Sequence, residues 1–166
     1  MSRVTVDLRD VVITGARQGE LALLSALAIR AKKHWGYPPE LIAEWLPELT
    51  ITPSSFESQE VMVARAAGRA LGFYALEFRD TTAALEHLWV DPPSMGIGVG
   101  RLLLRHAEEQ AYAKGFAYLE IDSDPNAEAF YLRMGAERVG SVSAPVPGDS
   151  DRTRPQMKLS VSQRDS

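Results

Sequence analysis

The stretch LWVDPPSMGIGVGRLLLRHAEEQAYAKG, residues 88–115, contains three sequence patterns in direct succession. It opens with the apolar end of a strand, Leu88–Val90. Asp91-Pro92-Pro93 ends that strand, because proline supplies no ladder donor and fixes φ. Alternate glycines follow, at positions 96, 98 and 100, and Gly115 suits the left-handed conformation that ends a helix. Between them a helical pattern places apolar residues on one side, namely Val99, Leu102, Leu103, Ala107 and Ala111.

A strand, a glycine loop and a helix N-terminus together favour binding of a phosphate group. Glycine lets the backbone approach an anion, and the N–H groups of the first helical turn and the helix dipole both attract negative charge. The alternative is that the glycines only make a tight strand-to-helix turn. Two nucleotide-binding patterns are excluded. A Walker A loop needs lysine and serine or threonine where this chain has Arg101-Leu102, and the dinucleotide fingerprint needs a glycine where it has Arg101 or Leu103.

The loop resembles motif A of the GCN5-related N-acetyltransferases, the GNAT family. In that motif a strand, a loop of the form Gln/Arg-x-x-Gly-x-Gly/Ala and a helix hold the pyrophosphate of acetyl-CoA. Met95 replaces the leading Gln/Arg, so we expect weaker cofactor binding rather than none. The resemblance implies that acetyl-CoA contacts Leu88, Trp89, Val90, Met95, Gly96, Ile97, Gly98, Val99, Gly100 and Arg101, together with Asn126 and Tyr131.

Length and composition bound the possible functions. The 166 residues are expected to form one domain, 1–166, and hydrophobic (45%) and charged (24%) contents are those of a soluble globular protein. A net charge of −4 argues against general nucleic-acid binding. The chain has no cysteine, which excludes disulfides and thiolate chemistry, and its histidines lack metal-ligand spacing. No apolar run approaches a membrane span and the N-terminus has no signal peptide, so we expect a cytoplasmic protein without a membrane partner.

The order of the expected elements is that of the GNAT fold. Helices are expected at 18–33, 40–48, 99–115 and 124–135, and strands at 4–9, 60–65, 71–78, 83–90, 116–121, 136–143 and 156–161. The strands at 83–90 and 116–121 must be parallel because a helix separates them. The expected fold class is therefore α/β (α+β), with a mixed, mostly antiparallel twisted sheet flanked by helices. The resemblance implies that the parallel pair splays apart to admit pantetheine.

A second segment, Asp124–Ala136, resembles the family's Asn…Ala-x-x-Phe-Tyr-x-x-x-Gly-Phe, shortened after the asparagine. In the family the asparagine bonds the pantetheine arm and the tyrosine protonates the departing thiolate. These roles are carried over to Asn126 and Tyr131. The alternative is that Phe130 and Tyr131 belong to a helix core and that Asn126 is a helix cap.

Acetyl transfer from a thioester to an amine needs a base, an oxyanion donor and an acid. The backbone N–H groups of Leu88–Val90 are expected to stabilise the oxyanion, and Tyr131 to act as the acid. Glu86 is expected to act as the base, because strict alternation would place it on the face of Leu88 and Val90 and His87 on the other. An equal alternative is that Glu86 is only a surface carboxylate and that the amine loses its proton through water.

The family builds its acceptor site from the first two helices. His34, Trp35 and Tyr37 lie at the break between them, near Trp45, and would form either an aromatic acceptor pocket or a hydrophobic hinge. The expected activity is transfer of acetyl from acetyl-CoA, without a metal, to an amine of a small molecule, peptide or protein. A catalytically silent CoA-binding sensor is the alternative. The sequence leaves open the acceptor, other acyl donors and the oligomeric state, although family members are often dimers.

Two further groups are expected to be structural. His106 lies near the apolar edge of the central helix and has no metal-ligand partner in the sequence. Arg152-Thr153-Arg154 falls in the segment 144–155, which is rich in Pro, Gly, Ser and Asp. We expect this run to be part of a solvated loop rather than a clamp for an acidic substrate.

Overall fold

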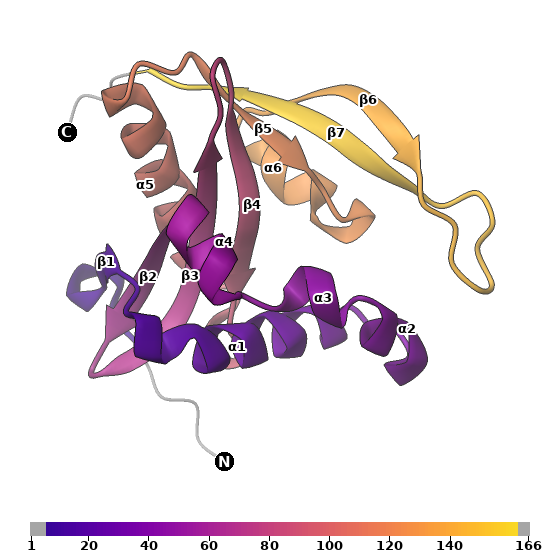
Figure 1. Cartoon of the computed structure of the whole chain (residues 1–166), viewed down its shortest axis with the longest axis horizontal. Helices are drawn as coiled ribbons and strands as arrows, with labels where there is room; N and C mark the ends of the chain where they lie inside the picture. Colours follow the sequence, from indigo (N-terminus) through magenta and orange to yellow (C-terminus); the bar gives the residue numbers. More distant parts are fainter. Residues whose placement is uncertain (1–5, 163–166) are drawn as a thin grey trace. The chain divides into compact units, whose positions relative to one another are not determined.

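The computed structural model describes residues 6–162, which form one seven-stranded sheet with helices (Figure 1). The strand order is β1-β2-β3-β4-β5-β7-β6. The strands are β1 Val12–Gly15, β2 Glu60–Ala66, β3 Arg69–Phe78, β4 Ala83–Val90, β5 Tyr118–Asp122, β6 Glu137–Ser143 and β7 Thr153–Ser160. β1 with β2, β2 with β3, β5 with β7 and β6 with β7 pair antiparallel, whereas β4 and β5 are parallel, with a register that runs from Ala83↔Leu119 to Leu85↔Ile121. The expected mixed sheet, with one parallel pair, is confirmed.

The α-helices are α1 Leu21–Lys33, α2 Pro39–Glu44, α3 Leu46–Leu49, α4 Pro53–Ser58, α5 Val99–Ala113 and α6 Glu128–Arg133. Short 3-10 helices are η1 Leu8–Asp10, η2 Gln18–Glu20, η3 Pro92–Ser94 and η4 Pro125–Ala127. Within the described residues 6–162, no helix is long and apolar enough to cross a membrane.

Several expected boundaries were wrong. The strand expected at 4–9 lies partly outside the described residues, and its described part leads into η1, because Asp7 accepts a hydrogen bond from the Arg9 amide and caps a 3-10 turn. The helix expected at 40–48 is divided into α2 and α3 at Trp45. The connection expected after Ile51 contains α4, because Thr52 and Ser55 form a reciprocal cap and Pro53 suits a first helical turn.

The chain divides into two compact units, and each contains part of the sheet. The first unit comprises the residues up to Leu76 together with 87–106, and the second comprises 77–86 together with 107–166. The expectation of one domain stays a prediction.

The core of the first unit is formed by α1 against β2 and β3. Its buried residues are Leu21, Leu24, Leu27, Ala28, Leu49, Ile51, Val61, Val63, Phe73 and Ala75. Arg65 of β2 forms a bidentate ion pair with Glu20, at 2.6 and 2.7 Å, which fixes the chain just before α1. The guanidinium lowers the pKa of Glu20 to about 2.

The core of the second unit lies on one face of β5 and β7. Leu119 is paired with Leu159 and Ile121 with Met157, and all four side chains are at most 3% exposed. Tyr131, Met134 and Ala136, within α6 and just after it, are also buried. Gly115 and Gly135 have φ values of 88° and 101°, so both glycines end their helices as expected.

β4 contains one residue more than its partner strand requires. The Arg79 amide donates to Thr82 O, and the Asp91 amide donates to Leu71 O, each at 2.8 Å. Between these bonds β3 advances eight residues and β4 nine, so β4 carries an additional residue, as in a β-bulge. The regular register of β3 and β4 is therefore interrupted at a point between these two bonds.

At Gly72 of β3 the backbone of β4 approaches closely. A Cβ at Gly72 would lie 2.6 Å from the Trp89 carbonyl oxygen and 3.2 Å from Val90 Cα, both backbone atoms that cannot rotate away. We expect Gly72→Ala to lower the free energy of unfolding by about 1–3 kcal/mol through overpacking. Urea unfolding measures this change.

Gly140→Ala in β6 is the matched control, because its Cβ would meet nothing within 4 Å. Equal stability changes for the two alanine variants would contradict the close approach of β3 and β4.

Candidate active site

The junction of β4 with α5 has the backbone geometry expected of a phosphate site. Gly96 and Gly98 have φ values of 80° and 102°, a region that favours glycine. The first bond into the helix runs from the Leu102 amide to Gly98 O at 3.1 Å. The amides of Val99, Gly100 and Arg101 therefore point out of the N-terminal end of α5, as helix geometry requires. This arrangement fits a diphosphate, which backbone amides and the helix dipole both attract.

The two glycines serve different needs. A Cβ at Gly96 would meet open space, so glycine is needed there for its φ value alone. A Cβ at Gly98 would lie 2.9 Å from Leu8 Cδ1.

Met95 is half-buried, and its amide donates to Pro92 O at 3.2 Å. The residue that replaces the Gln/Arg of the family motif therefore still takes part in the η3 turn.

Asp91 anchors the start of this loop. Its carboxylate accepts two hydrogen bonds from Arg30 of α1, Nε to Oδ1 at 3.0 Å and Nη2 to Oδ2 at 3.2 Å. The Asp91 side chain is 12% exposed, and that of Arg30 is 50% exposed. The Ser94 amide donates to Asp91 O at 2.8 Å and begins the η3 turn. The pairing of Arg30 with Asp91 was not expected from the sequence, because the two residues lie 61 positions apart.

His87 and Trp89 of β4 form a polar contact beside Phe73. The indole Nε1–H of Trp89 donates to His87 Nδ1 at 3.0 Å, and the His87 and Phe73 rings lie 6.0 Å apart. An indole only donates, so Nδ1 must be unprotonated and the neutral ring carries its proton on Nε2. Burial lowers the pKa of His87 to about 4, which agrees with a neutral ring.

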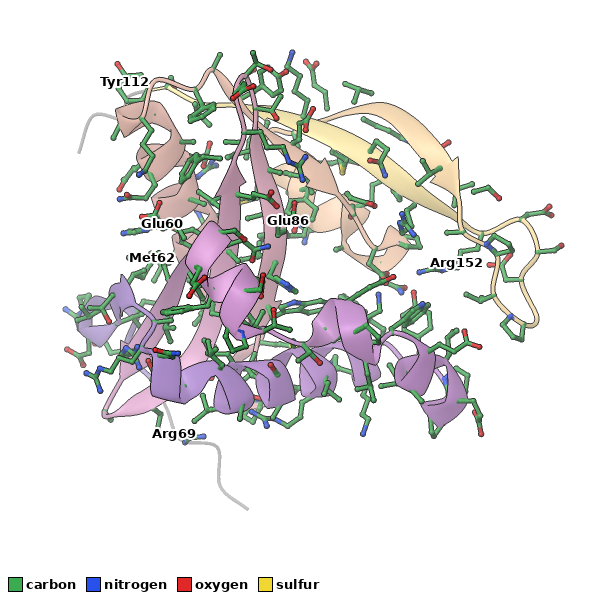
Figure 2. The ribbon with its side chains drawn as sticks, in the orientation of Figure 1. Glu60, Met62, Arg69, Glu86, Tyr112 and Arg152 are labelled. Atoms are coloured by element: carbon green, nitrogen blue, oxygen red, sulfur yellow. The ribbon has the colours of Figure 1, made fainter. Side chains whose placement is uncertain are left out.

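Glu86, expected as the base, lies within a group of charged side chains in the second unit (Figure 2). Arg79 Nη2 lies 2.9 Å from Glu86 Oε1, and Arg79 also contacts Glu77 at 3.6 Å and Glu120 at 3.9 Å. Burial raises the pKa of Glu86, and so does the charge of Glu77, whereas Arg79 lowers it. A carboxylate with a raised pKa is a better proton acceptor than an ordinary one. The Glu86 side chain is 32% exposed.

Asn126 and Tyr131 both belong to the second unit. Asn126 lies in η4, where Asp124 is the capping residue. Tyr131 in α6 is 7% exposed, and its ring packs edge-on against Phe130 with centroids 5.2 Å apart. Burial raises the pKa of Tyr131, so the phenol stays protonated at neutral pH.

The expected aromatic group after α1 separates into two pairs. His34 and Trp35 are exposed and meet edge-on at 6.4 Å. Tyr37 instead packs against Trp45, with centroids 4.8 Å apart. Lys32 Nζ lies over both of these rings, 4.4 Å from the Trp45 centroid and 5.1 Å from the Tyr37 centroid. The Lys32 ammonium thus lies against the Trp45 and Tyr37 rings, which were expected to face an acceptor.

His106 and the run Arg152–Arg154, for which no role in the reaction was expected, differ in how well the structure agrees with the expectation. His106 of α5 bonds the buried Tyr74 hydroxyl through Nδ1 at 2.7 Å, which is a packing role. Arg152 was expected in a solvated loop and is instead 9% exposed, because it reaches inward to a carbonyl and a carboxylate. Arg154 was expected in the same loop and lies instead in β7, where its side chain is 42% exposed and pairs with Asp122. Among residues 6–162, no group of three His, Cys, Asp or Glu side chains is arranged to hold a metal ion.

Removal of Arg30 is expected to lower the free energy of unfolding. In Arg30→Met the Asp91 carboxylate loses both charge-assisted hydrogen bonds while staying mostly buried, which costs about 1–3 kcal/mol. Arg9→Met is the control, because Arg9 also bonds an aspartate, Asp7, but both side chains are exposed, at 89% and 43%. Urea unfolding should show no measurable change for the control, because water screens an exposed pair. Equal effects would contradict the anchoring role of Asp91.

His87 predicts a pH dependence of stability. Its folded pKa of about 4 lies below the ordinary 6.5, so the unfolded chain binds the proton first as pH falls. Stability should be full above about pH 6.5 and decrease toward about pH 4, by up to about 3 kcal/mol. His87→Asn keeps an acceptor for the Trp89 indole without titrating, so its unfolding free energy should vary less across this range. The exposed His34→Asn should behave as the parent, and identical pH slopes in all three proteins would contradict the prediction.

Comparison with known proteins agrees with the expected family. A family model described as "Acetyltransferase (GNAT) family" matches residues 25–136, more than half of the chain. N-alpha-acetyltransferase RimI of Mycobacterium tuberculosis (strain ATCC 25618 / H37Rv) is 35% identical over 82 residues, which are 46% of this chain and 51% of that protein. The match thus spans about half the length of this curated relative.

Solved structures share the fold. PaiA N-acetyltransferase from Thermoplasma acidophilum, in complex with coenzyme A, has a TM-score of 0.70 and 20% identity, covering 90% of this chain and 98% of that one. The ribosomal-protein-S18-alanine N-acetyltransferase from Escherichia coli has a TM-score of 0.71 and 19% identity, covering 93% and 96%. The family match includes both the glycine loop and α6, and the fold agrees with these structures, so this chain belongs to the GNAT acetyltransferase family.

Proposed function

We propose that this protein transfers an acetyl group from acetyl-CoA to a primary amine. The observation that carries the proposal is the N-terminal end of α5, where left-handed Gly96 and Gly98 leave the following amides directed outward after β4. Family membership supports the choice of coenzyme A, as does the complex of the Thermoplasma acidophilum relative with that cofactor. Amides of residues 96–101 would bind the diphosphate.

The reaction needs no covalent enzyme intermediate. The amine nitrogen attacks the thioester carbonyl carbon, the new C–N bond forms, and the C–S bond breaks as the oxyanion collapses. Glu86 would take the proton that the amine loses, supported by its raised pKa. Tyr131 would give a proton to the departing sulfur, supported by its protonated state. Backbone amides of Leu88–Val90 would stabilise the oxyanion.

The acceptor we propose is the amino terminus of a peptide or protein, or a small-molecule amine. The peptide option is favoured by the relative from Mycobacterium tuberculosis, whose name describes N-alpha-acetylation. His34, Trp35 and Tyr37, at the α1–α2 connection, are the proposed acceptor residues. A catalytically silent CoA-binding module is the second candidate, and Met95 in place of Gln/Arg favours it. A homodimer and a cytoplasmic location are further proposals.

Turnover separates the two candidates. Titration calorimetry with acetyl-CoA tests the cofactor, and release of free thiol with peptides of different N-terminal residues, polyamines and lysine tests the reaction. Binding and amine-dependent thiol release are expected. Binding without thiol release on any amine would support the silent module, and no binding would contradict both.

Tyr131→Phe should lower kcat by about a hundredfold with little change in KM for acetyl-CoA, because general-acid catalysis contributes factors of this size.

Glu86→Gln should lower the rate at a pH below the pKa of the acceptor amine and regain much of it as pH approaches that pKa, where no base is needed. The reference pKa is about 7.7–8.0 for an α-amino group and about 10.4 for a lysine. The exposed Glu137→Gln of β6 is the matched control for the loss of a carboxylate. If Glu86→Gln and the parent have the same rate at every pH, Glu86 is not the general base and the proton is taken by water.

A further inference from the structure

Arg152, at the end of the loop that joins β6 to β7, is a buried arginine in a segment whose other residues are exposed or half-buried (Figure 2). Its Nη1 donates to the Ala144 carbonyl oxygen at 3.0 Å, across the base of the loop. Its Nη2 lies 3.5 Å from Asp124 Oδ2, the residue just before η4. The side chains of Arg152 and Asp124 are only 7% and 9% exposed. The guanidinium thus connects the loop to the segment that leads into α6.

The other oxygen of the Asp124 carboxylate holds Asn126. Asp124 Oδ1 accepts from the Asn126 backbone amide at 2.8 Å and from its side-chain Nδ2 at 2.9 Å. The Asn126 side chain is therefore oriented by the same carboxylate that Arg152 contacts. The Ser123 hydroxyl donates to Asp124 O at 2.7 Å, and the Ser123 amide donates to Pro155 O in β7 at 2.9 Å, so the segment between β5 and η4 is also bonded to β7.

Charge and burial distinguish this pair from its neighbour. Arg154 and Asp122 also form a bidentate pair, at 2.9 and 3.1 Å, but their side chains are 42% and 48% exposed. An exposed pair is screened by water and contributes little, whereas removing one member of a buried pair leaves the other charge without compensation. Among these two pairs, only the one formed by Arg152 includes a carboxylate that bonds Asn126.

We propose that Arg152 is a positioning residue: through Asp124 it holds the Asn126 amide in the orientation that binds the pantetheine arm of coenzyme A. The inference rests on the proposed function, in which Asn126 contacts that arm. The β6–β7 loop thereby tunes the affinity for the cofactor without touching it. Loss of Arg152 should therefore weaken the binding of the pantetheine arm and not that of the diphosphate, which is assigned to the amides of residues 96–101.

Two ligands test the proposal by calorimetry on the full chain: coenzyme A, and adenosine 3′,5′-bisphosphate, which lacks the pantetheine arm. Arg152→Met should raise the Kd for coenzyme A by about tenfold, the value of one good hydrogen bond. The Kd for the bisphosphate should be unchanged. Arg152→Lys retains the charge and should lie between Arg152→Met and the parent. Arg154→Met should bind both ligands as the parent does.

Equal coenzyme A affinity in Arg152→Met and the parent would overturn the proposal, and so would an equal loss for both ligands, which would indicate general damage to the fold. A parent that binds neither ligand would instead overturn the proposed function. The effect of Arg152 on Asn126 is measured separately, in the protein without ligand, from the ¹⁵N–¹H NMR signals of the Asn126 side-chain amide. Arg152→Met should move these signals and Arg154→Met should not. Unmoved signals in Arg152→Met would overturn the positioning role whatever the ligands do.

Discussion

Asp91 bonds three parts of the first unit through three different polar groups. Its amide donates to Leu71 O in β3, its carbonyl accepts from the Ser94 amide, and its carboxylate accepts from Arg30 of α1. β4 therefore ends at a defined point, and the glycine loop begins there in a defined direction. The direction of outward-facing amides determines where an anion binds, so the position of the α5 terminus depends on this aspartate.

The two units use a similar device at different places. In the first, an arginine from a helix holds the aspartate before the glycine loop, and in the second, an arginine from a loop holds the aspartate before α6. The two aspartate side chains are only 12% and 9% exposed, and each aspartate precedes a segment that the sequence resemblance predicts to contact the cofactor. Buried ion pairs add little net stability compared with apolar packing, but two hydrogen-bonded charges accept few alternative geometries. Their value here is the orientation of a neighbouring backbone or amide group.

Features with local causes were predictable from the sequence. The glycines at the ends of α5 and α6 were recognised from their place in the helical patterns, and the parallel pairing of β4 with β5 follows from the helix between the two strands. The start of β7 at Thr153 was missed, because Pro155 indicated a loop although proline is tolerated near the beginning of a strand. The pairs Arg30–Asp91 and Arg152–Asp124 join residues 61 and 28 positions apart, and no periodicity marks them. The additional residue in β4 likewise depends on pairing with β3 rather than on composition.

The cation–π contacts of Lys32 bear on which acceptors suit the α1–α2 connection. Its ammonium already lies over the rings of Trp45 and Tyr37, and it is attached to α1 just before them. A tethered group competes at an effective concentration on the order of millimolar. A positively charged acceptor present at micromolar levels would therefore be a poor competitor for these two rings. An acceptor that docks here is better served by an uncharged or acidic portion, which the lysine attracts rather than opposes.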